Sequence, residues 1–184
     1  MTLLILGVLL WSAAHLFKRV APSVRAPLGD AGKGFVAVAL LISVVLMVIG
    51  YRNAGGAFYW GRDPMWVGIN NLLMVVAFYF FAASAAKGDK IWLGTKVRHP
   101  QLTSVIIWGV AHLLVNGDTR SFVLFGGLII WAIVEIIIIN AQEGPWQRPG
   151  RAPAKKEVVA IVVTLVVTVV VMVIHYALGV TPWG

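Results

Sequence analysis

The sequence predicts an all-α, polytopic membrane protein, a bundle of about six transmembrane helices that form a single domain over residues 1–184. Hydrophobic residues make up 60% of the 184-residue chain and charged residues only 12%, and the mean hydropathy is +0.89. A soluble domain is about half apolar and about a quarter charged, so this chain has too few polar side chains to cover a globule in water. Its apolar residues also fall into six long runs, with the basic residues between them.

Each apolar run is about as long as the roughly 20 residues that a helix needs to cross a bilayer. The predicted spans are 2–19, 34–51, 65–86, 101–116, 119–140 and 157–178. The first run has no basic start and no small-residue cleavage site, and Lys18 and Arg19 follow it, so we expect a mature span and not a signal peptide. The last run is rich in valine and isoleucine, but in lipid it must be helical, because a lone strand leaves its backbone unsatisfied.

Three local signals describe how the later spans are joined. Pro100 suits the first turn of the fourth span, where its missing N–H costs nothing. The link Asn116-Gly117-Asp118 is so short that the fourth and fifth spans must form a tight antiparallel hairpin. The fifth loop, from Gly144 to Pro153, contains three prolines and is expected to be non-helical.

The basic residues predict the orientation of the bundle. Twelve of the 15 lie in the first, third and fifth loops, which hold Lys18, Arg19, Arg25 and Lys33, then Lys87, Lys90, Lys96 and Arg98, then Arg148, Arg151, Lys155 and Lys156. The even loops hold only Arg52, Arg62 and Arg120. The positive-inside rule places the odd loops in the cytoplasm and both termini outside, an N-out/C-out topology.

Composition also excludes several kinds of site and partner. The chain has no cysteine, which excludes disulfides, thiolate zinc sites, iron–sulfur clusters and covalently attached c-type haem. It has no serine–histidine–acid set and no H-E-x-x-H motif. The net charge of +8 is explained by topology, and because the basic residues are divided among three loops without aromatic interleaving, no nucleic acid is expected as a partner.

Polar residues inside the spans are the candidates for chemistry, because each costs several kcal/mol unless it is paired or functional. They are His15, His99, His112, His175, Glu135, Asn70 and Asn71. Imidazoles in a membrane helix bundle commonly bind the iron of haem b, which needs no cysteine. Trp11 with His15 and Trp108 with His112 are each four residues apart. Each pair therefore shares one helix face, where the indole could form a wall for a porphyrin.

Simpler roles remain open for each of these residues. A histidine can hydrogen-bond a neighbouring helix, His175 can lie at the outer interface, and the tryptophans can belong to an aromatic belt. Glu135 can neutralise Arg98 or His99. Depth in the membrane leaves three histidine pairs as ligand candidates, which are His15 with His112, His15 with His99, and His112 with His175.

Several motifs resemble those of the NnrU family over essentially the whole chain. The specific part of the resemblance comprises Arg98-His99-Pro100-Gln101, Trp108, Ala111-His112-Leu113, Asn116-Gly117-Asp118, Leu124-Phe125-Gly126-Gly127 and Trp131. The N-terminal stretch from His15 to Arg25, followed by Leu28-Gly29, fits the same family. NnrU proteins are bacterial membrane proteins associated with denitrification and nitric oxide metabolism. The resemblance implies a multi-pass protein of the bacterial inner membrane with that role.

The NnrU family is similar to the 15-cis-ζ-carotene isomerases, which are haem b proteins. That resemblance implies haem b as the cofactor and His15 and His112 as its axial metal ligands, and His99 matches as a further cofactor-binding residue. Trp11 and Trp108 are cofactor-binding candidates because of their spacing to the two histidines. Trp131 stands where those isomerases have another histidine. The polyene substrate of the isomerases makes a haem-dependent cis–trans isomerisation an alternative function.

A more distant resemblance is to isoprenylcysteine methyltransferases, which have Arg-His-Pro at a helix start and use S-adenosylmethionine. Leu102, Thr103 and Ser104 stand here in place of their tyrosine and glycine. Whether the protein is an enzyme therefore stays open. The expected partners are the lipid bilayer, a lipophilic small molecule, and a membrane protein or a second copy of the chain.

Overall fold

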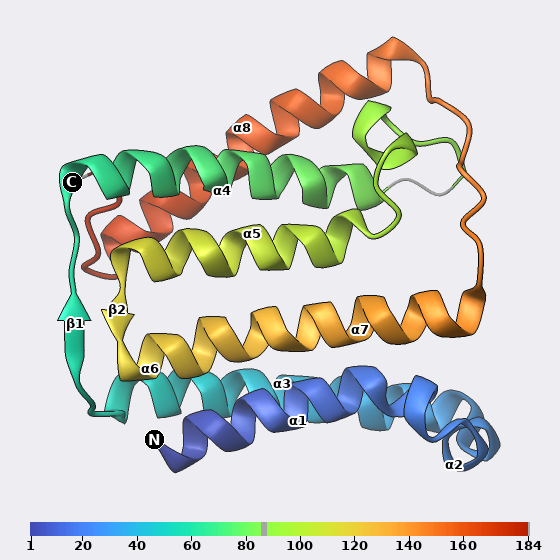
Figure 1. The fold of residues 1–184 in the computed structure, drawn as a ribbon, viewed down its shortest axis with the longest axis horizontal. Coiled ribbons are helices and arrows are strands. Elements are labelled where there is room, and N and C mark those ends of the chain that lie inside the picture. Colours follow the sequence, from blue (N-terminus) through green and yellow to red (C-terminus); the bar gives the residue numbers. More distant parts are fainter. Residues whose placement is uncertain (86–87, 184) are drawn as a thin grey trace.

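The computed structural model describes residues 1–85 and 88–183 and confirms an all-α helical bundle (Figure 1). The long helices are α1 (Thr2–Val20), α3 (Gly29–Asn53), α4 (Pro64–Ala85), α5 (Pro100–Val115), α7 (Gly127–Glu143) and α8 (Ala154–Ala177). Five helical segments of the described chain are long and apolar enough to cross a membrane, one of them being α7 with the short elements before it. Helix α5 is apolar but has only 16 residues.

Helix boundaries agree with the predicted spans to within a few residues, counting the short elements before α7 with that helix, except at the start of α3. This helix begins five residues earlier than the predicted position 34. Two short helices, α2 (Pro22–Arg25) and η1 (Ala26–Leu28), lead into it, and Gly29 turns the chain with a φ of 51°, which favours glycine. Residue 86, the predicted end of the third span, and Lys87 lie outside the described residues.

The predicted connections are confirmed. Pro100 occupies the first turn of α5. The chain reverses at 116–118 and continues through α6 (Thr119–Ser121) and a π-helical turn, η3 (Phe122–Gly126), into α7. Residues 144–153 contain no helix.

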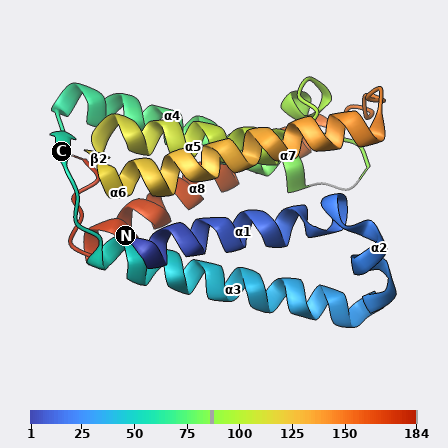
Figure 2. The same cartoon turned by 60° about the horizontal axis from the view of Figure 1, so that its bottom comes forward.

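The long helices pack in the spatial order α3, α1, α7, α5, α4, α8. Helix α7 therefore lies between α1 and α5, and Figure 2 shows α1 and α3 as a pair to one side of the others. Gly7 of α1 lies against Met47 and Ser43 of α3, and Gly109 of α5 lies against Ile129 of α7. Such small residues let helices approach closely in a membrane.

Both termini lie at one end of the bundle, and the loops that follow α1, α4 and α7 lie at the other (Figure 1). This agrees with the predicted grouping of the loops, while the side of the membrane that each end faces stays a prediction. The terminal end also has a ribbon of two antiparallel strands, β1 (Phe58–Trp60) and β2 (Gly117–Asp118), which the sequence did not predict because two- and three-residue strands have no measurable period.

Asp118 ends the ribbon and caps helix α6. Its carboxylate accepts a hydrogen bond of 2.8 Å from the Ser121 backbone N–H. Partial burial alone would raise the pKa of Asp118, but the bonds to Ser121 and the nearby Arg120 guanidinium outweigh it and hold the pKa below its usual value.

Candidate functional site

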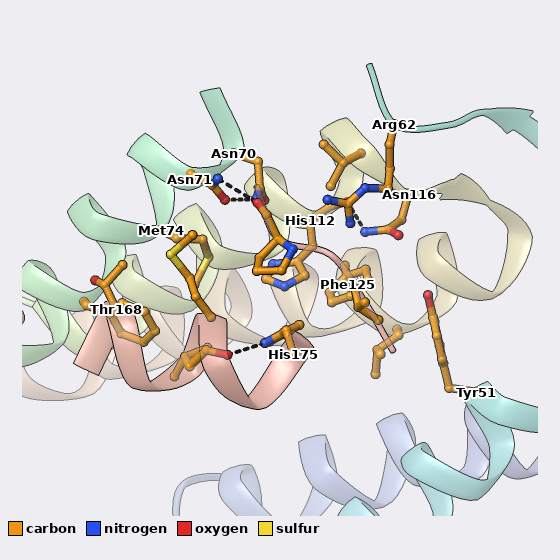
Figure 3. A pocket seen from close by; sticks show the side chains of 17 residues that line it. Tyr51, Arg62, Asn70, Asn71, Met74, His112, Asn116, Phe125, Thr168 and His175 are labelled. Atoms are coloured by element: carbon orange, nitrogen blue, oxygen red, sulfur yellow. Dashed lines mark hydrogen bonds between the residues drawn. The ribbon is translucent and has the colours of Figure 1, made fainter. Parts of the chain in front are cut away.

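A cavity of about 240 Å³ lies between α4, α5, α8 and the π turn, near the end of the bundle that holds the termini. Its polar lining residues are Tyr51, Arg62, Asn70, Asn71, His112, Asn116, Thr168 and His175 (Figure 3). Met74, Phe78, Phe125 and Met172 are among its apolar lining residues. The cavity is therefore amphipathic, as a site for a ligand with one polar and one apolar part would be.

Both histidines of the cavity are held in one tautomer. Nδ1 of His112 lies 2.8 Å from the carbonyl oxygen of Trp108, and Nδ1 of His175 lies 2.8 Å from that of Val171. A carbonyl oxygen only accepts, so each Nδ1 must donate its proton, and Nε2 of the neutral ring has the lone pair. No described residue hydrogen-bonds either Nε2. This is the form of histidine that binds a metal ion, with its second nitrogen fixed by a backbone carbonyl.

The two rings are also at a distance that suits a shared metal. The centres of the His112 and His175 rings are 6.5 Å apart. Two imidazoles on opposite sides of one metal ion, with metal–nitrogen bonds of about 2.0 Å, have ring centres roughly 6.3 Å apart. Among the described residues no group of three or more histidine and acidic side chains could hold a metal. An iron that brings its other ligands with it, as in haem, suits two histidines better than a bare ion does.

The π turn shapes one wall of the cavity. Leu124 and Phe125, which are neighbours in sequence, both line it. Phe125 stacks on the His112 ring at 4.8 Å with an interplanar angle of 29°, and it makes an edge contact with Trp108 at 5.0 Å between ring centres. Single π-helical turns are often found at functional sites, because the extra residue redirects side chains.

Hydrogen bonds from α4, and from the segment before it, to the C-terminal residues close another side of the cavity. The Asn70 amide donates to the Oδ1 of Asn71, and the Asn71 amide donates to the carbonyl of Pro182 (Figure 3). Arg62 donates to the carbonyl of Thr181. Oδ1 of Asn70 is buried without a hydrogen-bond partner. A buried acceptor of this kind needs a donor that a ligand or water would supply.

The predicted residues Trp11 and His15 lie elsewhere, at the contact between α1 and α7. Nδ1 of His15 lies 3.0 Å from the Trp11 carbonyl, so its Nε2 also has the lone pair. The His15 ring, however, packs against two indoles, with ring centres 4.3 Å from Trp11 and 4.7 Å from Trp131. The indole nitrogens of Trp11 and Trp131 and Oε2 of Glu135 are buried there without hydrogen-bond partners.

The predicted residue His99 lies at the opposite end of the bundle. It lines a separate cavity of about 320 Å³, together with Arg98 and Trp146. Nε2 of His99 bonds Oδ1 of Asn140 at 2.9 Å, and Arg98 pairs with Glu143 at 3.5 Å. Among the described residues, Glu135 has no ion pair or hydrogen bond with Arg98 or His99, so the interpretation that it neutralises one of them is not supported.

The structure thus brings together Trp108 and His112, and separately Trp11 and His15, but it does not bring the two pairs to one cavity. Helix α7 lies between them. The assignment of His15 and His112 to one iron stays a prediction. Sequence reasoning offered His175 as a ligand only in a pair with His112, on the ground of their similar depth, and included Asn70 among the polar candidates. It gave no binding role to Arg62, which only the packing places at the cavity.

The donor atoms of the cavity fit haem b, whereas its volume is small for it. Two imidazoles suit the iron, and Arg62 suits the two carboxylates of the haem edge. Pockets for drug-sized ligands hold roughly 300–1,000 Å³, and haem is a large ligand. A porphyrin therefore requires other lining side chains, such as Met74, Phe78 and Met172, to move aside while the two histidines keep their separation.

Comparison with known proteins gives one match. The family model described as NnrU protein matches residues 3–182, nearly the whole chain. No curated protein and no solved structure matches the chain.

Proposed function

Because the chain belongs to the NnrU family, we propose that it is a haem b-binding protein of the bacterial inner membrane with a role in denitrification and nitric oxide metabolism. The observation that supports this proposal most is the pair His112 and His175. Both line one cavity, their ring centres are 6.5 Å apart, and each has its Nε2 lone pair unused.

The chain's own residues would divide the work of holding the cofactor. The His112 imidazole binds the iron, and its orientation is fixed by the Trp108 carbonyl and by Phe125 stacked on its face. Arg62, at the edge of the cavity, pairs with haem carboxylates, and Met74 and Phe78 contact the apolar ring. Haem b supplies one-electron redox chemistry and an iron that binds small gases once a ligand leaves.

Two residues compete to be the second axial ligand. His175 is favoured by geometry, because it shares the cavity with His112. His15 is favoured by the resemblance to the haem isomerases, but α7 and two indoles lie around it. We propose His175, so that His15 has a packing role between Trp11 and Trp131.

An absorbance spectrum of the detergent-purified protein from haem-replete cells, oxidised and then reduced, tests the proposal. A Soret band is expected, and His112→Ala should lose at least tenfold of the bound haem. His175→Ala should lose the band or convert it to a five-coordinate spectrum, while His15→Ala and His99→Ala should keep the parent spectrum.

The outcomes separate the parts of the proposal. A colourless parent protein would reject haem binding. A parent spectrum that survives in His175→Ala but is lost in His15→Ala would replace His175 by His15 as the ligand.

The small volume of the cavity supports a second candidate, binding or modification of a lipophilic molecule. The unused acceptors Asn70 Oδ1 and the two imidazole nitrogens would take hydroxyl or amine donors of its head group, with its tail against Met74 and Phe78. This candidate includes a methyltransferase-like enzyme, whereas a cis–trans isomerase of polyenes would depend on haem and so belongs with the first proposal. Mass spectrometry of extracts from a colourless preparation tests it: one apolar compound should co-purify, and Asn70→Leu should lose it.

A further inference from the structure

The turn that joins α1 to α3 forms a basic groove, far from the histidine cavity. The groove is lined by Lys18, Pro22, Arg25, Ala26, Gly29, Asp30 and Lys33, and its volume is about 550 Å³. Three of these side chains are cations and one is an anion, so the groove has a net positive charge. Asp30 is already paired with Lys33, at 2.8 Å.

The shape of this groove is built by the backbone of the turn. Helices α2 and η1 cross from the end of α1 to the start of α3, where Gly29 has its positive φ. The Arg25 guanidinium donates to the Gly29 carbonyl at 3.1 Å and lies against Gly32, where a larger side chain would take its place. Arg25 is therefore held at the groove, and no described acid pairs with it or with Lys18.

Apolar side chains beside the groove are exposed. Val20 is 67% exposed, Val24 60% and Leu28 37%. In water these positions would be unfavourable, but beside lipid they place methyl groups in the outer part of the acyl chains. The groove thus combines a cationic site with an apolar rim.

Helix lengths place this turn at the level of the lipid head groups. Helix α3 has 25 residues, a length of about 38 Å, whereas the hydrocarbon core is about 30 Å thick. Its first turn, with Asp30 and Lys33, therefore extends beyond the core, and Lys18 lies in the last turn of α1. The phosphate of a bilayer lipid lies at the same depth.

From this charge, rim and depth we infer that the groove binds the phosphodiester head group of an anionic phospholipid. Lys18 and Arg25 contact the phosphate, and Val20, Val24 and Leu28 contact the acyl chains of the same lipid. The site is independent of the proposed haem site, since the two lie at opposite ends of the bundle (Figure 1).

Native mass spectrometry of the full chain in detergent tests this inference, with phosphatidylglycerol and phosphatidylcholine of the same acyl chains as probes. The parent protein should retain phosphatidylglycerol in preference. The double variant Lys18→Gln/Arg25→Gln should weaken that binding about 30-fold, because each of the two cations near an anionic lipid surface contributes roughly 1 kcal/mol. The matched control Lys96→Gln/Lys155→Gln removes the same charge at the same end of the bundle, outside the groove, and should bind like the parent.

Several results would overturn the inference. An equal loss of phosphatidylglycerol binding in the control variant would indicate diffuse charge attraction. Equal binding of the two lipids would also overturn the inference, and so would displacement of the lipid by inorganic phosphate alone at millimolar concentration. Circular dichroism in phosphatidylcholine checks that the double variant folds. If it does not, Lys18→Gln alone replaces it, with Lys96→Gln as control and a smaller loss expected on the same scale.

Discussion

Helices α1 and α5 contain the same local arrangement in two different surroundings. Each has a tryptophan followed four residues later by a histidine whose Nδ1 donates to the tryptophan carbonyl, at 3.0 Å in α1 and 2.8 Å in α5. In α1 the imidazole packs between indoles, and three polar atoms nearby have no partner. In α5 the imidazole lines a cavity opposite a second histidine.

This comparison separates what the local sequence determines from what packing determines. The helix backbone and the side-chain rotamer determine the tautomer, because Nδ1 meets the carbonyl four residues back in both cases, as it also does in His175 with Val171, where no tryptophan is present. The neighbouring helices decide whether the remaining lone pair meets an indole or a cavity. A histidine motif in a membrane helix thus indicates a ligand only when the adjacent helix leaves space for one.

The largest effect on the α1 side is expected from Trp131→Ala. Trp131 is 6% exposed and contacts both Trp11 and His15, so its removal leaves a large void. The free energy of unfolding should fall by about 3–5 kcal/mol. Denaturant titration in detergent measures this, and the position of any Soret band should not move. A shifted band would mean that the two histidine regions share a ligand.

Phe125→Ala tests the α5 side in the same way. Phe125 is 6% exposed and stacks on His112, so the stability loss should be similar or slightly smaller, about 3 kcal/mol. Here the spectrum of the bound group should change, because the imidazole loses its support. An unchanged spectrum together with the full loss of stability would show that His112 is not a ligand.

Glu135→Leu should stabilise the protein by about 1–3 kcal/mol. The substitution removes a buried carboxylate oxygen without a partner and replaces it with a side chain of similar size. Glu143→Leu is the matched control on the same helix. It breaks the ion pairs with Arg19 and Arg98, at 2.7 Å and 3.5 Å, and should not be stabilising. If Glu135→Leu is destabilising instead, the carboxylate has a partner such as a bound water.

Asp118→Asn should have the smallest effect, a loss of up to about 1 kcal/mol at neutral pH, because the amide still caps α6 but loses its charge beside Arg120. The folded pKa of Asp118 is lowered, so its contribution is present above the ordinary pKa and is lost as the pH falls through the folded pKa. Thermal unfolding temperatures of parent and variant should therefore differ at neutral pH and converge only as the pH falls below the ordinary carboxyl pKa of about 3.9. If the thermal unfolding of parent and variant still differs at the lowest pH, the difference comes from packing and not from the charge of Asp118.

Most of the fold could be predicted from the sequence because a bilayer imposes a simple length rule on apolar runs. Pro100 and the Asn116-Gly117-Asp118 link added two correct connections. The spatial order of the helices could not be predicted, because all six are apolar on every side and no periodic face indicates which neighbour each one meets. For this reason the motifs around His15 and His112 do not indicate that α7 lies between the two histidines.

The candidate site was predicted only in part, because spacing along one helix can be read from the sequence and packing between helices cannot. His112 and Trp108 share a helix face, which spacing alone reveals. His175 and Asn70 come from α8 and α4, which are distant in sequence, so only the packing shows that they line one cavity.

The π turn at Phe122–Gly126 has a consequence for how sequences of this kind can vary. One residue in a regular helix corresponds to a rotation of about 100°. A π turn absorbs one extra residue, because its five residues wind through roughly the same angle as four α-helical ones, so a single deletion here would restore regular winding and leave α7 nearly in place. Such a deletion should be felt at Leu124 and Phe125, which line the cavity, while Trp131 keeps its contact with His15, whereas a deletion inside α7 itself would rotate every later residue by about 100°.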